Sequence, residues 1–347
     1  MKFIRRFSAV VIGIVFFVAG LLKLMDPVGA GLVVDEYFKF FHLRFLSFSS
    51  GVTGFALAAL ETLTGAALIT GVFRKFVSVL SGLMLLFFTL ITLVLVIFNP
   101  SMDCGCFGEA LHLTHMQSFL KNLLLCALWI GAFIPIRNVG KPSGIKYFSF
   151  SLAVLVVGFF AFHGLVSIPM IDFTNYSPGT ELMSVYDGPE WNAQILSFSD
   201  AEGQYLDTVA VSGNVLIVSV FDPEKLSEKK WEEARTFCAE ASENGFRPLL
   251  LVASTPSRMS SIAETPDCTC YADRRDLLTL NRSNGGATMI IDGMIVTKWP
   301  AARIPEPGLL SKIMSIDATD VMMRHNTRKR LVAQSFALGT LALMLVL

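Results

Sequence analysis

The chain has 347 residues, of which 53% are hydrophobic and only 16% charged, a composition typical of a membrane protein and not of a soluble one. The formal net charge of zero hides an asymmetry, because the stretch from Met170 to Arg324 holds 22 acidic and 13 basic residues and so carries nine net negative charges. An acidic soluble domain joined to a basic membrane part is therefore expected. No basic patch interleaved with aromatic residues lies outside the membrane flanks, which argues against nucleic-acid binding.

Six apolar runs predict membrane spans. They cover residues 8–24, 51–72, 76–98, 117–136, 147–168 and 331–347. Lys2, Arg5 and Arg6 precede the first run and place the N-terminus in the cytoplasm, and no small-x-small cleavage site follows, so an uncleaved anchor is expected. The last run has 17 residues and is interpreted as a span clipped at its end.

Short basic turns set the predicted topology. Arg74 and Lys75 mark one cytoplasmic turn, and the basic residues 137, 141 and 146 mark a second. The charged segment 26–50 is expected to lie along the outer surface. A basic cluster before the last run breaks the positive-inside pattern locally, which a long translocated domain tolerates. The loop after residue 98 and the domain 170–324 then face the periplasm, outside a bacterial inner membrane.

The most informative stretch runs from Asn99 to Glu109 and contains Cys104 and Cys106. Gly105 allows a positive φ, so the chain can curl and bring both thiols to one side. Such a pair can close into a strained, reducible disulfide, bind a soft metal, or remain a structural element. Nearby acidic residues 103 and 109 are expected to raise the pKa values of the thiols, which favours a resting disulfide.

Cys268 and Cys270 repeat the same spacing in the soluble domain, which strengthens the redox interpretation. A structural disulfide and a free pair remain open for them. Both pairs are predicted on one side of the membrane, so we hypothesise that Cys268 and Cys270 exchange with the membrane pair as a tethered relay. Cys126 and Cys238 are interpreted as small buried hydrophobic residues.

Two further features suggest chemistry. Glu61 is the one acidic residue deep in a predicted span, where a charge is costly unless it is paired or faces a cavity. It could relay protons, contact a quinone-like electron acceptor, or simply pack against polar neighbours such as Lys23. His112 and His115 follow the first cysteine pair and leave a metal-handling function open.

The soluble domain shows an α/β pattern. Strands are predicted at 215–221 and 248–253, helices at 224–245, 274–281 and 307–316, and a hairpin at 288–299 that turns at Asp292-Gly293. This order is similar to that of a thioredoxin-like domain. Residues 222–225 read Asp-Pro-Glu-Lys where a redox-active member carries Cys-x-x-Cys, and Ala287 stands at the usual cis-proline position. The domain is therefore not expected to act as a thioredoxin.

The membrane half resembles a known family. Ala19-Gly20-Leu21-Leu22-Lys23, Glu61 followed by Gly65, and above all Cys104-Gly105-Cys106-Phe107-Gly108 resemble the DoxX-like superfamily, specifically its MauE branch, over residues 1–137. The resemblance implies a four-helix membrane bundle and, for MauE proteins, a role in maturing methylamine dehydrogenase that is thought to involve periplasmic disulfide formation. With its appended domain, the whole chain resembles DoxX-type membrane proteins of Bacteroidales.

Together these features predict an α-helical transmembrane bundle plus an α/β thioredoxin-like extracytoplasmic domain. The expected parts are a DoxX/MauE-like domain (1–137), a tethering helix (146–169), the soluble domain (170–324) and a C-terminal helix (331–347). The preferred function is thiol-disulfide redox work on exported proteins through Cys104, Cys106, Cys268, Cys270 and Glu61. The alternatives are a non-enzymatic assembly scaffold and a metal-handling protein. The expected partners are the lipid bilayer, exported protein thiols and a quinone-like acceptor.

Overall fold

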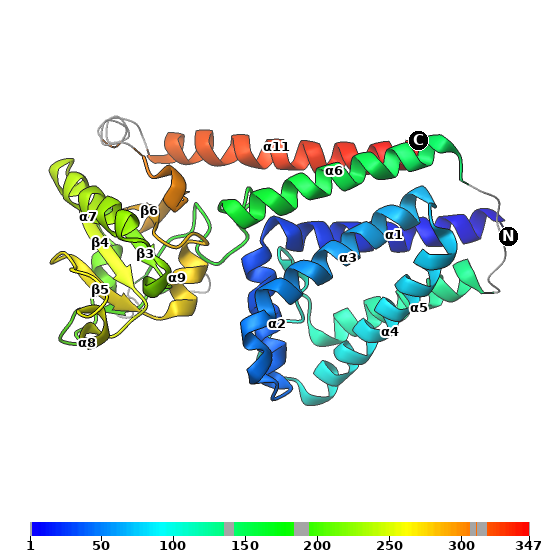
Figure 1. Cartoon of the computed structure of the whole chain (residues 1–347), viewed down its shortest axis with the longest axis horizontal. Coiled ribbons are helices and arrows are strands. Elements are labelled where there is room, and N and C mark those ends of the chain that lie inside the picture. Colours follow the sequence, from blue (N-terminus) through cyan, green and yellow to red (C-terminus); the bar gives the residue numbers. More distant parts are fainter. Residues whose placement is uncertain (1, 135–141, 184–193, 306–309, 311–317, 347) are drawn as a thin grey trace. The chain divides into compact units, whose positions relative to one another are not determined.

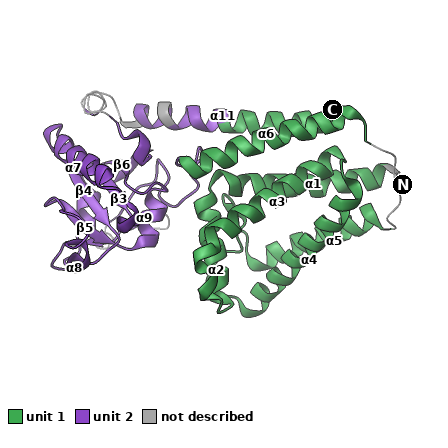
Figure 2. Ribbon diagram, viewed as in Figure 1, with its two compact units in different colours: residues 1–166, 333–347 green, residues 167–332 purple. Residues whose placement is uncertain are grey.

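The computed structural model describes residues 2–134, 142–183, 194–305, 310 and 318–346. The chain forms two compact units, residues 1–166 with 333–347 and residues 167–332 (Figure 2). Each unit is described by itself.

Long helices build unit 1 (Figure 1). They are α1 (Lys2–Met25), α2 (Pro27–Phe40), α3 (Ser50–Thr70), α4 (Arg74–Phe98), α5 (His115–Phe133), α6 (Gly144–Val166) and the C-terminal part of α11 (Ala318–Val346). Six helices within the described residues are long and apolar enough to cross a membrane, in agreement with the six predicted spans. The protein is therefore a multi-pass membrane protein. The predicted basic turn at 137 and 141 lies outside the described residues.

Glycines allow α1 and α3 to pack with their backbones in contact. A Cβ on Gly20 would lie 2.6 Å from the backbone nitrogen of Thr62, and one on Gly65 would lie 2.3 Å from that of Phe17. Small residues at such positions permit close approach of membrane helices, and Figure 1 shows the two helices side by side. The same view shows α4 beside α5, where the indole N–H of Trp129 donates to the Ser78 carbonyl at 2.9 Å. This packing fixes the ends of α1, α4 and α5 around the cysteine loop.

Unit 2 contains a six-stranded mixed sheet of order β2-β5-β4-β3-β6-β7. The strands are β2 (Phe198–Ser199), β3 (Asn214–Val220), β4 (Arg247–Val252), β5 (Thr269–Ala272), β6 (Gly286–Ile291) and β7 (Met294–Trp299). Strands β3, β4 and β5 run parallel, whereas β2, β6 and β7 pair antiparallel with their neighbours. The parallel pair β3 and β4 is connected through α7 (Glu228–Glu243), as a parallel crossover requires.

Alternating side chains of β3 divide the core of unit 2 into two clusters. Leu216, Val218 and Val220 pack with Trp231 of α7 on one face of the sheet. Val215 and Ile217 pack on the other face with residues of α9 (Arg274–Leu280). Since successive side chains of a strand point to opposite faces, the continuous apolar run of β3 is buried on both sides.

Most predicted elements of the soluble domain are present within a few residues. The two buried strands, the short helix and the hairpin turning at Asp292-Gly293 match β3, β4, α9 and the β6–β7 pair. The helix predicted from residue 224 instead begins as a 3-10 turn, Pro223–Lys225, and α7 starts only at Glu228. Ser227 interrupts the helix because its backbone is extended (φ −69°, ψ 154°). The predicted closing helix lies outside the described residues, except for residue 310.

Candidate functional site: a dithiol loop beside a buried lysine–glutamate pair

The loop between α4 and α5 is held in place by its glycines and by α2. Gly105 has φ +60°, and a Cβ there would lie 2.3 Å from Cγ1 of Val33 on α2. The hydroxyl of Tyr37, also on α2, donates a hydrogen bond to the Cys104 carbonyl at 2.9 Å. Glycine is needed here on both conformational and steric grounds. The loop therefore presents its thiols in a fixed orientation.

The two thiols of this loop have different surroundings. Cys104 is only 6% exposed, and its Sγ lies 2.8 Å from the hydroxyl oxygen of Ser118 on α5. Cys106 begins the short strand β1 (Cys106–Glu109), is partly exposed, and forms a side-chain hydrogen bond with Cys104. Neither is in a disulfide in this structure. Cys104 is therefore the buried thiol of the pair, and Tyr37 holds its backbone against α2.

The electrostatics of the loop distinguish the thiols further. The hydrogen bond from Cys104 lowers the pKa of the Cys106 thiol to about 5, against burial, with help from the charges of Lys121 and Lys23. The pKa of Cys104 is raised, first by that same hydrogen bond and then by burial. The prediction that neighbouring carboxylates raise both pKa values is therefore wrong for Cys106, since the charges that act on it are the two lysines. The pair can hold one thiolate and one thiol.

A buried ion pair lies next to the loop. The Lys23 ammonium on α1 is 2.6 Å from Oε2 of Glu61 on α3, and the two side chains are only 14% and 7% exposed. A Cβ on Gly108 of the loop would contact Cγ of Lys23 at 3.5 Å. Of the possibilities raised for Glu61, contact with Lys23 is the one that the structure shows. The pairing compensates the cost of placing a carboxylate inside the membrane domain.

Lys121 on α5 completes the site and was missed by sequence reasoning. Its ammonium lies 4.9 Å from the ring centroid of Phe107 in the cysteine loop, a cation–π contact. The available signal was a lone lysine inside the predicted span 117–136, which is as unusual there as Glu61 is in its own span. Five chemically active side chains therefore meet here, two thiols, two ammonium groups and one carboxylate.

The two histidines of the suggested metal pattern contact other groups in place of the cysteine thiols. Nδ1 of His112 lies 2.9 Å from Oδ2 of Asp103, and Nε2 of His115 lies 2.8 Å from the Met102 carbonyl oxygen. Among the described residues, no group of three or more His, Cys, Asp or Glu side chains could hold a metal ion. The geometry therefore adds no support to the metal-handling alternative.

Cys268 and Cys270 do not form a facing pair. Cys268 precedes β5 and packs against the α7 side of the sheet, whereas Cys270 lies in β5 and is buried on the opposite side. The partner of Cys268 is Cys238 on α7, with which it forms a side-chain hydrogen bond. Cys238 is 3% exposed and lies in the hydrophobic core, as predicted, and α7 also places it beside Cys268.

These contacts divide the three thiols by acidity. The hydrogen bond with Cys238 lowers the pKa of Cys268 to about 7, whereas burial raises the pKa of Cys270 to about 11. Of these three thiols Cys268 is therefore the most acidic, and the thiol beside it is Cys238.

The position after β3 carries an ion-pair cluster instead of a dithiol. The Asp222 carboxylate accepts hydrogen bonds from Arg274 at 3.0 and 3.1 Å and from Lys225 at 3.2 Å. Ala287 lies fully buried on β6, paired with Val218. Asp222 thus takes part in surface ion pairs, and Ala287 packs within the sheet, so neither position carries redox chemistry of the thioredoxin type.

Comparison with known proteins identifies a family for the membrane part. Residues 1–135 match the family model of methylamine utilisation protein MauE, so the membrane part with its cysteine loop is a MauE-like membrane domain. Neither the search of curated proteins nor the search of solved structures finds a match for the chain. The fold and this match define a multi-pass membrane protein with a MauE-like domain and a mixed-sheet α/β domain.

Proposed function

We propose that this protein is a membrane thiol-disulfide redox protein whose working pair is Cys104 and Cys106. The observation that carries the proposal is the inequality of these two thiols, one buried and one partly exposed with a pKa near 5. At pH 7 a thiol with that pKa is thiolate by about a hundred to one. A stabilised thiolate favours the reduced state, so the disulfide form of the loop would be a strong oxidant.

The exchange would proceed in two steps. A thiolate of an exported protein attacks Sγ of Cys106, the accessible sulfur of the disulfide, and the electron pair of the broken S–S bond goes to Cys104, which takes up a proton. A second thiolate of the same protein then displaces Cys106, which leaves as a stabilised thiolate. The exported protein gains a disulfide, and the loop holds the two electrons as a dithiol. Reoxidation passes two electrons and the proton of Cys104 to a quinone-class acceptor in the bilayer, which takes its second proton from water.

Three charged side chains near the loop would support this cycle without contacting the substrate sulfur, namely Lys23, Lys121 and Glu61. The two ammonium groups favour the thiolate of Cys106, and Glu61 fixes Lys23 at 2.6 Å. A carboxylate in this position could also accept the proton that leaves the loop on reoxidation. The two nearby ammonium groups stabilise the Cys106 thiolate, a stabilisation that a cysteine in a mobile surface loop would not experience.

The second unit is assigned a thioredoxin-like fold in this proposal, on the strength of its parallel β3–β4–β5 block followed by the antiparallel β6 and β7. The relay then runs through Cys268 with Cys238 as its partner, and Cys270 takes no part. The basic turn at residues 74 and 75 supports an orientation in which the cysteine loop and unit 2 face the periplasm from a bacterial inner membrane.

The test traps the exchange intermediate in cells. Cys104→Ser removes the thiol that resolves the intermediate, so when the Cys106 thiolate attacks a disulfide of an exported protein the mixed disulfide persists, and non-reducing gels followed by mass mapping should show Cys106 joined to exported proteins. Cys106→Ser should trap far less, because the remaining thiol is buried. Cys126→Ser on α5 is the matched control, since that thiol contacts Thr89 and lies outside the loop. Absence of mixed disulfides with Cys104→Ser, or equal trapping by both loop variants, would refute the proposal and favour a scaffold.

A further inference from the structure

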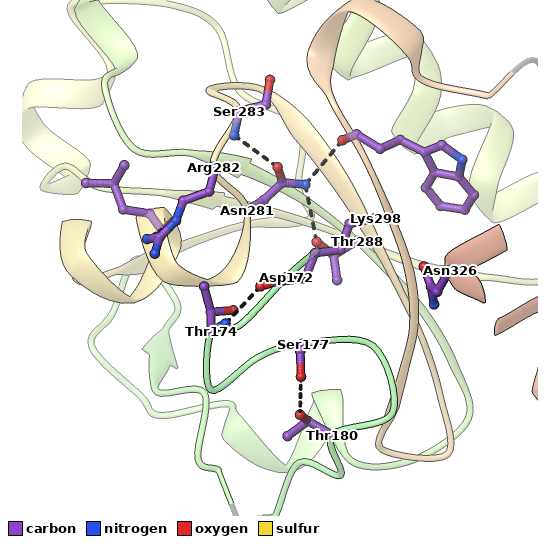
Figure 3. Close-up of polar contacts among 12 residues, drawn as sticks. Asp172, Thr174, Ser177, Thr180, Asn281, Arg282, Ser283, Thr288, Lys298 and Asn326 are labelled. Carbon is purple, nitrogen blue, oxygen red and sulfur yellow. Dashed lines mark hydrogen bonds and ion pairs between the residues drawn. The ribbon is translucent and has the colours of Figure 1, made fainter. Parts of the chain in front are cut away.

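Unit 2 contains a basic cavity that the redox chemistry does not use. Its volume is about 240 Å³, well above the room that one water needs. Four basic residues and one acidic residue line it, namely Arg282, Lys298, Lys329, Arg330 and Asp172. Figure 3 shows Asp172, Arg282, Lys298 and Asn326, which come from four separate stretches of the chain.

The cationic side chains at the base of this cavity are held in place. Lys298 of β7 is 5% exposed and lies 2.6 Å from the Asp172 carboxylate, whose pKa is lowered by Lys298 and by a hydrogen bond from the Thr174 backbone N–H in spite of burial. Arg282 is 8% exposed and donates to the Leu278 carbonyl at 3.0 Å. The neighbouring Asn281 donates to the Trp299 carbonyl at 3.2 Å, which ties this turn to β7 (Figure 3). These five lining side chains carry four positive charges and one negative charge.

The chain positions of the lining residues place the cavity at the depth of lipid headgroups. The span α6 ends at Val166, and the lining begins two residues later at Ile168. At the other end, the lining residues Lys329 and Arg330 directly precede the apolar part of α11. The 29 residues of α11 extend about 43 Å, whereas the hydrocarbon core is about 30 Å thick, so part of the helix lies outside the hydrocarbon, and the charged residues of α11 all precede Leu331.

We infer that this cavity binds a phosphate-class anion, supplied either by the headgroup of an anionic phospholipid or by free phosphate. Guanidinium and ammonium groups are the protein donors that phosphate oxygens prefer, and two of them are already desolvated and oriented here. Ile168, Pro169 and Met170 add an apolar rim beside these cations, which suits a ligand that has a charged head and an apolar tail. The inference does not depend on the redox proposal.

The test uses the full-length protein purified in detergent, with phosphatidylglycerol and phosphatidylcholine as lipid probes and native mass spectrometry to count retained lipid. The variant Lys329→Gln/Arg330→Gln removes one cation from a partly exposed position and one from an exposed position, and it leaves the buried Lys298–Asp172 pair intact. Arg328→Gln is the matched control, because Arg328 is exposed on the same helix and does not line the cavity. Retention of phosphatidylglycerol over phosphatidylcholine should fall by about thirty-fold in the double variant and stay near wild type in the control.

Added inorganic phosphate, with chloride as the reference anion, separates the two sources. Competition by phosphate that displaces phosphatidylglycerol, or a phosphate-dependent rise in thermal stability lost in the double variant, assigns the site to the phosphate group itself. Selective phosphatidylglycerol binding that phosphate does not displace assigns it to the whole lipid headgroup. Equal retention of the two lipids with no response to phosphate, or an equal loss in Arg328→Gln, would overturn the inference.

Discussion

Replacing Cys104 with alanine gives the sharpest test of the site, because the hydrogen bond from Cys104 is the largest cause of the low pKa of Cys106. A hydrogen bond to a charged group contributes about 1.5–3 kcal/mol, which corresponds to about one to two pH units. In reduced wild-type protein, the rate of Cys106 alkylation by iodoacetamide should rise through pH 5 and be level by pH 7. In Cys104→Ala the midpoint should move up by about one to two pH units, since both lysines remain.

The assay measures modification of the Cys106 peptide by mass spectrometry between pH 4 and pH 10. Ser118→Ala is the matched control, because the Ser118 hydroxyl is the last of the contributions that lower the pKa of Cys106, and its removal should move the midpoint least. A wild-type midpoint between pH 8 and 9, or an unchanged midpoint in Cys104→Ala, would refute the reasoning about the thiolate.

Two further predictions follow from buried pairs. Lys23→Met should destabilise the protein in detergent by about 3–5 kcal/mol, whereas adding Glu61→Leu should recover much of the loss because no unpaired charge remains; equal loss in both would contradict the pairing. Mild oxidation of the full chain at pH 8 should join Cys238 to Cys268 and leave Cys270 as a thiol, as peptide mapping can show; a Cys268–Cys270 bond would contradict the division of these thiols between the two faces of the sheet.

The order of elements could be read from the sequence because local patterns encode it. Apolar runs of sufficient length predicted six spans, and the β-branched run around Ile217 predicted a strand buried on both faces. The turn at Asp292-Gly293 was equally visible, since a tight hairpin needs residues that accept positive φ, which both adopt (+45° and +79°). These features depend on residues adjacent in sequence.

The candidate site could be predicted only in part, for the same reason. Cys104, Cys106 and Glu61 stood out as unusual residue types in their surroundings. The difference between the two thiols could not be seen, because it depends on Tyr37, which is far from the loop in sequence, and on how α5 folds Lys121 back toward the loop. The spacing of Cys268 and Cys270 suggested a pair, whereas in the fold Cys268 lies next to Cys238.

By itself, the sequence determined that this protein spans the membrane several times, that an acidic α/β domain is inserted before the last span, and that a polar loop carries two cysteines. The tertiary structure decided which groups act on them. Packing of α1 against α3 brings Lys23 to Glu61, and α7 brings Cys238 to Cys268. Hydrophobic length and periodicity are local properties, whereas a pKa or a thiol partnership depends on distances between atoms that only the folded chain sets.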